Sequence, residues 1–302
     1  MILTVYLKLI RWKNLLLITY IFLLIKLLFF PSFYLETKLA DFQFFQLLLS
    51  ILLIAAAGYI INDIVDIKAD LINKPQKVIV SKIITIEKAT HWYKITNTIG
   101  IFLGIVLCLK IGKPTYSFFF IGGALLLYYY SINLKSKPLV GNLIVAFLIS
   151  LSILILGLFE IDFSSKNPYQ NIAINTLILI SLFAFIINLI REIVKDIEDI
   201  NGDNTLNIKT LPILFGIHRI KNLVSFLCLI PIGLIVFLII NYSVIYKITM
   251  VYLLIFSLIP LLYVLLKIRS AKKKYEFSKL SKLLKIIMFL GINSLIIFSI
   301  FH

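Results

Sequence analysis

Long apolar stretches recur along the whole chain and alternate with short polar segments. Each stretch is close to the roughly 20 residues that a helix needs to cross the hydrocarbon core of a bilayer. The pattern predicts nine membrane-spanning helices, at residues 14–33, 43–62, 93–111, 115–131, 140–159, 171–190, 221–240, 246–266 and 282–301. We therefore expect an all-α membrane protein.

The composition of the 302-residue chain supports this class. Hydrophobic residues make up 61% of the chain and charged residues 15%, whereas a soluble domain carries about 25% charged residues. The two cysteines, Cys108 and Cys228, fall inside expected spans, which argues against a disulfide framework or a cysteine-based zinc site. No short apolar stretch with a small-residue cleavage site opens the chain, so we expect the first span to remain in the mature protein.

The net charge of +16 is distributed unevenly between the two sides of the expected membrane. With nine spans, the N-terminus and every second connection lie on one side, and these segments hold most of the Lys and Arg residues. The opposite side holds only Lys38, Lys110, Lys113, Lys166 and Lys247. Because basic segments stay in the cytoplasm, we expect a cytoplasmic N-terminus, and an inner-membrane location in a prokaryote. Topology explains the charge without a nucleic-acid partner.

More than half of the 14 acidic residues lie in two short windows. The first window, 62–70, reads N-D-I-V-D-I-K-A-D, and the second, 192–203, reads E-I-V-K-D-I-E-D-I-N-G-D. Both contain the pattern D-I-x-D-I-x-x-D, and each lies at the cytoplasmic end of an expected span. The repeat predicts two helical bundles related by a two-fold arrangement and facing one site.

Helical spacing makes the two windows chemically useful. At about 100° per residue, Asn62, Asp66 and Asp70 fall within one narrow arc, with Asp63 at its edge. The second window forms a similar stripe, made of Glu192, Asp196, Asp199 and Asp203. Clustered carboxylates repel one another unless a cation lies among them, and oxygen ligands suit Mg²⁺. We expect magnesium ions between two opposed acid rows, completed by phosphate oxygens of a substrate.

Charged residues in and near the expected spans can also have structural roles that involve no metal. A solvated acidic loop is disfavoured, because acids near membrane depth are rare and costly and here they recur in register. Glu198 lies off the stripe, and we expect it to pair with Lys195 or Arg191. Lys26 lies inside the first span, where it is expected to reach the interface or to face the helix bundle.

The two windows together resemble the paired motifs of the UbiA superfamily of intramembrane prenyltransferases, N-D-x-x-D-x-x-x-D and K-D-x-x-D-x-x-G-D. Further matching segments are Ile10-Arg11-Trp12-Lys13-Asn14, Asn73-Lys74-Pro75, Tyr130-Ser131 with Lys135, Gly141-Asn142 and Thr210-Leu211-Pro212. The resemblance covers about residues 8–220. It implies one domain of nine helices in two pseudo-repeated bundles (about 8–140 and 141–302) around a central cavity with cytoplasmic cap loops.

The resemblance also implies an activity, namely Mg²⁺-dependent transfer of an isoprenyl group from a prenyl diphosphate to an acceptor. The second motif looks most like that of members that add a geranylgeranyl chain to geranylgeranylglyceryl phosphate. An aromatic acceptor of the 4-hydroxybenzoate, dihydroxynaphthoate or homogentisate type is the alternative. A cation transporter is a remote one, because the acids lie at one membrane face and the spans lack Gly and Pro breaks.

Site roles follow for particular residues. Expected metal ligands are Asn62, Asp63, Asp66, Asp70, Glu192, Asp196, Asp199 and Asp203, and the expected catalytic residues are Asp66, Asp70, Asp199, Asp203 and Tyr130. Expected substrate-binding residues are Arg11, Asn14, Tyr59, Lys74, Lys77, Tyr129, Lys135 and Lys195. The alternative for the tyrosines is interfacial anchoring, and for the lysines a topogenic role. Leu71 and Asn204 stand where the family commonly has basic residues.

Overall fold

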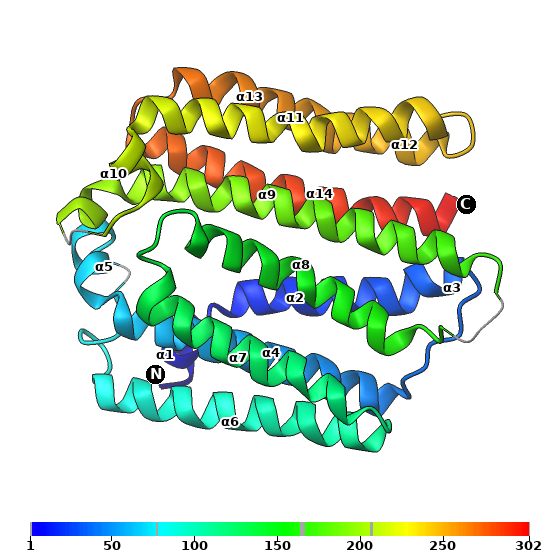
Figure 1. The fold of residues 1–302 in the computed structure, drawn as a ribbon, viewed down its shortest axis with the longest axis horizontal. Coiled ribbons are helices and arrows are strands. Elements are labelled where there is room, and N and C mark those ends of the chain that lie inside the picture. The colour runs from blue at the N-terminus through cyan, green and yellow to red at the C-terminus, as the bar shows by residue number, and fades with distance from the viewer. Residues whose placement is uncertain (1, 77, 164–166, 206–207, 302) are drawn as a thin grey trace. The chain divides into compact units, whose positions relative to one another are not determined.

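The structure, a computed structural model, describes residues 2–76, 78–163, 167–205 and 208–301 (Figure 1). Among these residues the regular structure is helical, apart from one isolated bridge between Val80 and Ile84. The helices are α1 (Ile2–Leu9), α2 (Trp12–Leu24), η1 (Ile25–Phe29), α3 (Phe30–Ser32), α4 (Asp41–Val65), α5 (Ile67–Asn73), α6 (Ile86–Lys110), η2 (Pro114–Tyr116), α7 (Ser117–Tyr129), η3 (Tyr130–Leu134), α8 (Val140–Glu160), α9 (Gln170–Thr205), α10 (Leu211–Phe215), α11 (Ile217–Tyr242), α12 (Lys247–Leu253), η4 (Leu254–Leu258), α13 (Ile259–Ser270) and α14 (Lys274–Phe301). The all-α prediction is confirmed.

Nine spans long and apolar enough to cross a membrane are found among the described residues, one for each predicted stretch. The chain is therefore a multi-pass integral membrane protein. Several spans extend beyond their predicted ends, most clearly α9, which has 36 residues and runs well past residue 190. Hydropathy locates the apolar part of a helix, whereas backbone hydrogen bonding continues into the polar turns that follow. Those polar turns carry the acidic windows.

The chain divides into two compact units. Unit 1 comprises residues 1–22, 38–137 and 201–208, and unit 2 comprises 23–37, 138–200 and 209–302. Each unit thus takes in a short segment from the other half of the sequence. The single-domain prediction and the repeat boundaries stay predictions.

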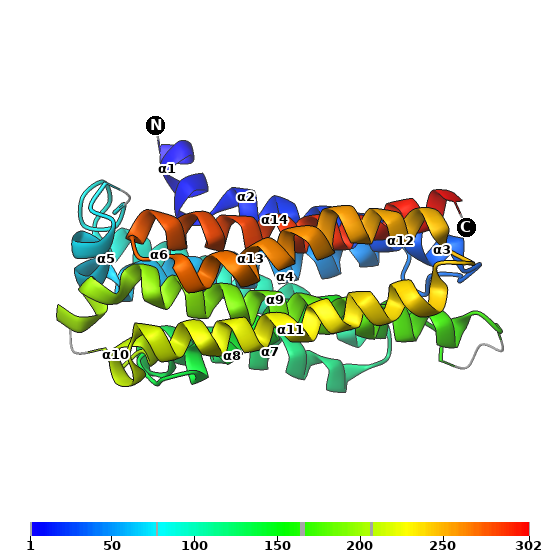
Figure 2. The ribbon, with the colours of Figure 1, turned by 90° about the horizontal axis from the view of Figure 1, so that it is seen from above.

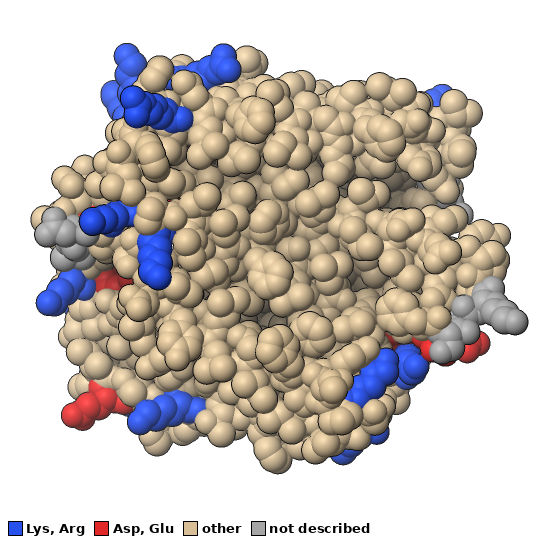
Figure 3. All heavy atoms as spheres, in the orientation of Figure 1, with Lys and Arg blue, Asp and Glu red and all other residues tan. Residues whose placement is uncertain are grey.

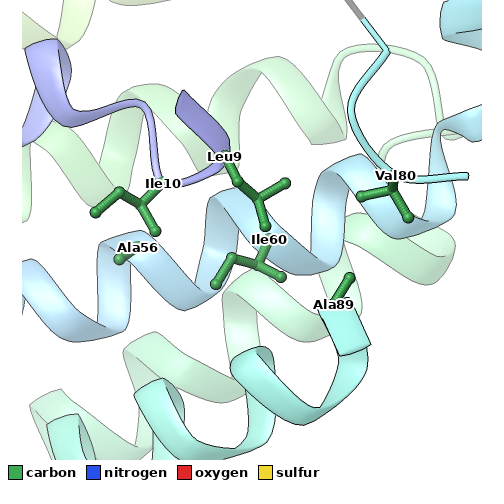
Figure 4. Close-up of a cluster of buried hydrophobic side chains, with 6 residues drawn as sticks. All are labelled: Leu9, Ile10, Ala56, Ile60, Val80 and Ala89. Carbon is green, nitrogen blue, oxygen red and sulfur yellow. The ribbon is translucent and has the colours of Figure 1, made fainter. Parts of the chain in front are cut away.

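In unit 1, α4 packs along α6 and against α7 (Figure 1). The approach of α6 to α7 depends on Gly104, because a Cβ atom there would lie 2.3 Å from Cγ of Phe120. Buried aliphatic side chains connect α1, α4, the segment after α5 and the start of α6, as Figure 4 shows; they are Leu9, Ile10, Ala56, Ile60, Val80 and Ala89. This core holds α1 against the end of α4 that carries the first acidic window.

In unit 2, α13 packs against both α11 and α14, and Figure 2 shows the three helices running side by side. Polar contacts join α8 to α9, where the Ser150 and Ser181 hydroxyls lie 2.7 Å apart. Lys26 of η1 donates to Glu160 at the end of α8 over 2.9 Å, and both side chains are buried. Lys26 therefore faces the bundle, one of the two positions expected for it.

Candidate active site

The first acid row lies at the junction of α4 and α5, in unit 1. The spacing argument assumed one continuous helix, and this is wrong at Asp66, where the backbone turns (φ −84°, ψ 3°) between Val65 and Ile67. Two hydrogen bonds still bridge the junction, from Asp66 N to Asn62 O (2.9 Å) and from Asp70 N to Asp66 O (2.8 Å). Asn62, Asp66 and Asp70 therefore keep their four-residue spacing across the break.

Asp66 is the buried centre of this row, with 8% of its surface exposed. Its Oδ2 accepts from Asn62 Nδ2 at 2.9 Å and also from the ammonium group of Lys135, which follows η3. Desolvation would lower the pKa of Lys135, but Asp66, Tyr130 and Asp70 together outweigh it and the pKa is raised. Lys135, predicted as a diphosphate ligand, therefore carries a full positive charge beside the predicted metal ligand.

Arg11 neutralises the neighbouring acid, Asp63. Its Nη2 lies 2.7 Å from Asp63 Oδ1, and its guanidinium carbon lies 4.9 Å from the centre of the Tyr59 ring. Asn14 Nδ2 donates to the Tyr59 hydroxyl over 3.3 Å. Three predicted substrate-binding residues thus meet one predicted metal ligand.

Arg11 also connects α1 to α2 in a left-handed conformation, with φ of 53°. Such a backbone costs a residue with a side chain about 1–2 kcal/mol. The pairing with Asp63 and the stacking on Tyr59 hold it in place.

Asp70 lies on α5, one turn beyond the junction. Burial raises the pKa of Asp70, and the Asp66 and Asp63 carboxylates add to this, whereas Lys135 and Lys74 lower it. The ionised form of Asp70 is therefore disfavoured first by burial and then by the two neighbouring carboxylates. Another cation placed here would lower the free energy of the ionised row.

The second acid row lies on α9, and its first acid, Glu192, is paired with two cations of the same helix. Glu192 is buried, and its two oxygens accept from Arg191 Nη1 at 2.7 Å and Lys195 Nζ at 2.8 Å. The prediction that Glu198 is the partner of these cations is therefore wrong: among the described residues Glu198 forms no ion pair. Glu192 and Glu198 are both three residues from Lys195, but Glu192 precedes the lysine, which is the more favourable order of acid and base on a helix, and it also lies next to Arg191.

Asp196 is held by a residue outside the predicted site, Asn142. The Asn142 amide donates to Asp196 Oδ2 over 2.8 Å from the first turn of α8, and only 8% of Asn142 is exposed. The one sequence feature that pointed to Asn142 was the Gly141-Asn142 pair, which resembles a family segment. No local pattern relates that pair to α9, 54 residues later.

The last turn of α9 belongs to unit 1 and carries Asp203. There Gly202 N donates to Asn73 Oδ1 over 3.0 Å, and a Cβ atom on Gly202 would lie 2.3 Å from Asn73 Nδ2. Glycine at this position of the second motif lets the helix approach the residue that follows the first motif. Asp203 is thereby fixed to the unit that holds the first acid row.

The remaining predicted site residues divide by exposure. Tyr130 is half-buried and is one of the groups that act on Lys135, in keeping with a place at the site. Tyr129 is 55% exposed, which favours the interfacial alternative for its ring. Asp199 and Asp203 are half-buried on α9. Lys77 lies outside the described residues.

The oxygen donors of the first row fit magnesium chemically. They are carboxylates and one amide, the hard ligands that Mg²⁺ takes, and the buried Asp66 already attracts one cation, Lys135. In the described part of the chain, no three His, Cys, Asp or Glu side chains converge closely enough to form a complete metal site. A metal held here would need oxygens from substrate as well, which is usual for Mg²⁺ with phosphates.

Known proteins are similar to this chain over most of its length. The chain is 39% identical over 246 residues to the digeranylgeranylglyceryl phosphate synthase of Saccharolobus solfataricus, covering 79% of this chain and 80% of that one. It is 36% identical to the Sulfurisphaera tokodaii enzyme of the same name, covering 84% and 87%.

Two solved structures share the fold. One, of a digeranylgeranylglyceryl phosphate synthase, has a TM-score of 0.67 at 25% identity and covers 99% and 98% of the two chains. A UbiA homologue from Archaeoglobus fulgidus bound to DMAPP and Mg²⁺ has a TM-score of 0.58 at 15% identity, covering 96% and 98%. Residues 15–291 match the UbiA prenyltransferase family, and the chain belongs to it.

Proposed function

We propose that this enzyme transfers the geranylgeranyl group of geranylgeranyl diphosphate to geranylgeranylglyceryl phosphate and releases diphosphate. Two relatives named for this activity match about four-fifths of the chain at 36–39% identity. Their names imply the same acceptor that the second motif predicts. The observation that carries the proposal is the buried carboxylate of Asp66, in the first motif. It accepts hydrogen bonds from Asn62 of the same motif and from Lys135. A metal-bound diphosphate needs both kinds of group, because carboxylates bind the metal ions and an ammonium group donates to the phosphate oxygens.

The bond changes balance as follows. The C–O bond between C1 of the prenyl chain and the diphosphate breaks, and its electron pair leaves with the diphosphate. An acceptor hydroxyl oxygen forms the new C–O bond, and its proton passes to the released diphosphate. Magnesium, when bound, neutralises the leaving group's charge as a Lewis acid; Asn62, Asp63, Asp66 and Asp70 would hold it from the first row, and Glu192, Asp196, Asp199 and Asp203 from the second.

The chain's own cations bind and orient the anionic substrate groups. Lys135 and Lys74 act on the first row, so each is placed to donate to diphosphate oxygens once metal compensates the carboxylates. Lys195 serves the second row in the same way. Arg11, which is half-exposed beside Tyr59, is our candidate for the acceptor's phosphate, with Asn14 positioning the tyrosine. Tyr130 offers a π face without a nucleophile to the carbon that loses the leaving group.

The test is turnover by purified protein in detergent with geranylgeranyl diphosphate, Mg²⁺ and a mixed acceptor pool, followed by mass spectrometry of the product. We expect the digeranylgeranyl glyceryl phosphate mass, and loss of about two to three orders of magnitude in kcat for Asp66→Asn. Asp41→Asn, at the first turn of α4, is the matched control and should retain activity. A prenylated aromatic product, or full activity in EDTA, would overturn the proposal.

The sidedness of the site has a separate test. We propose that the N-terminus and both acid rows face the cytoplasm, because the connections on that side carry most of the basic residues. Both native cysteines are buried, so a single new cysteine can report accessibility to a membrane-impermeant maleimide in intact cells. Lys247→Cys should be labelled from outside and Lys273→Cys only after lysis. The reverse result contradicts the orientation.

A further inference from the structure

A groove lies between α11 and α13, within unit 2 and on elements that carry none of the acid-row residues. Its volume is about 300 Å³. On α11 it is lined by Asn222, Ser225, Phe226 and Leu229, whose spacing places them on one helix face. Leu266 and Arg269 line it from α13. The lining is thus built from two adjacent membrane spans.

The groove is polar at one end and apolar along the rest. Lys221 near the start of α11 donates to the Ala271 carbonyl just after α13, so the start of one helix and the end of the other lie together. Asn222, Ser225 and Arg269 therefore share the end nearest the loops. Phe226 and Leu229 extend the wall further along α11, opposite Leu266, and these three are at least half exposed.

Ser225 is the informative member of this lining. It is only 2% exposed, yet among the described residues no group lies within hydrogen-bonding distance of its hydroxyl oxygen. A buried hydroxyl without a partner costs about 1–3 kcal/mol. The cost is removed if a ligand in the groove accepts its hydrogen bond.

The charge around the polar end specifies the sign of that ligand. Within the described chain, the Arg269 guanidinium and the Asn222 amide have no hydrogen-bond or ion-pair partner. Lys and Arg side chains gather at the upper left of Figure 3, over the ends of α11 and α13, without a visible acidic group among them. Glu276, the one acid after residue 217, instead accepts from the backbone N–H groups of Lys272 and Lys273.

We propose that this groove binds an anionic membrane lipid, separately from the prenyl-transfer site. The lipid phosphate accepts hydrogen bonds from Arg269, Asn222 and Ser225, and one hydrocarbon chain lies along Phe226, Leu229 and Leu266. A basic residue at the end of a span and an apolar wall below it match the two ends of such a lipid.

Native mass spectrometry of the detergent-purified protein tests the proposal. Phosphatidylglycerol, phosphatidylcholine and glycerol phosphate are added separately at equal concentration. We expect retained phosphatidylglycerol adducts, few phosphatidylcholine adducts and none with glycerol phosphate. Arg269→Gln should lower phosphatidylglycerol retention about fivefold, and Ser225→Leu should lower it by filling the groove. Lys273→Gln, an exposed lysine outside the groove, is the matched control and should retain wild-type binding.

Three outcomes would overturn the proposal. Equal retention of the two phospholipids, or equal losses in Arg269→Gln and Lys273→Gln, indicates a general lipid coat. Binding of glycerol phosphate as strong as that of the lipid indicates an anion site without a chain groove. Because Arg269 is exposed at the end of α13, its variant tests the idea even if Ser225→Leu fails to fold.

Discussion

The two acid rows share one sequence pattern but are neutralised in different ways. The first takes its cations from distant parts of the chain: Arg11 pairs with Asp63 and Lys135 with Asp66, 52 and 69 residues apart. The second takes its cations from the same turn of α9, where Arg191 and Lys195 hold Glu192. The first row therefore depends on tertiary structure for its ion pairs, whereas Glu192 of the second row meets its two cations as soon as its helix forms.

The backbone also differs between the two acid rows. At Asp66 the first helix ends and α5 begins, whereas α9 continues unbroken through all of the second motif. The break in the first acid row places Asp70 and the residues after it on a separate short helix, whereas the second row lies on one continuous helix.

The largest effect on stability is expected from the ion pair between Lys26 and Glu160. Like Lys135–Asp66 it joins residues distant in sequence, but both of its side chains are buried. Lys26→Met leaves Glu160 charged without its partner in a membrane span, and breaking such a pair costs about 3–5 kcal/mol. A thermal-shift assay in detergent should show a large fall in Tm, and the double variant Lys26→Met with Glu160→Leu should recover most of it. A single variant as stable as wild type would contradict a structural role.

Next in size is the loss of Lys135, the cation of the first row that we propose to bind diphosphate. Lys135→Ala should lower kcat/KM for the prenyl diphosphate about a hundredfold, because a charge-assisted contact to the leaving group is lost. Steady-state kinetics at saturating acceptor measure this, with Lys137→Ala, two residues further, as the control. Equal losses in the two variants would remove Lys135 from the site.

A smaller effect is expected where α9 meets α5. Gly202→Ala places a methyl group against Asn73 and should lower kcat about tenfold, because a misplacement on the ångström scale at a reacting site costs up to a hundredfold. Replacing Asn73 by Ala removes the obstructing amide, so Gly202→Ala should be less harmful in that background. If the two changes multiply independently, the Gly202–Asn73 contact does not position Asp203.

The smallest effect is expected from Lys195, and it is the direct counterpart of the Lys135 variant. Lys195→Ala leaves Glu192 paired with Arg191, so kcat/KM should fall only about threefold to tenfold, in line with loss of one redundant charge-assisted contact. The ratio of the Lys135→Ala and Lys195→Ala effects, measured in one assay, quantifies the difference between the rows. A ratio near one would mean that both rows rely on their lysines equally.

Sequence alone determined the spans, the acidic windows and the family, because each depends on residues close together in the chain. A run of apolar residues crosses a bilayer whatever surrounds it, and four-residue spacing places Asn62, Asp66 and Asp70 on successive turns. For the same reason it located Arg11 and Lys135 only as members of segments that resemble the family, and Tyr59 only by its depth in an expected span.

Tertiary structure decided the partners. It broke the helix at Asp66, gave Arg191 and Lys195 to Glu192 rather than Glu198, brought Asn142 to Asp196 and fitted Gly202 against Asn73. The last of these contacts joins residues 129 positions apart. The physical reason is that hydropathy and helical period act over a few turns, whereas ion pairs and close backbone approaches depend on which surfaces pack together.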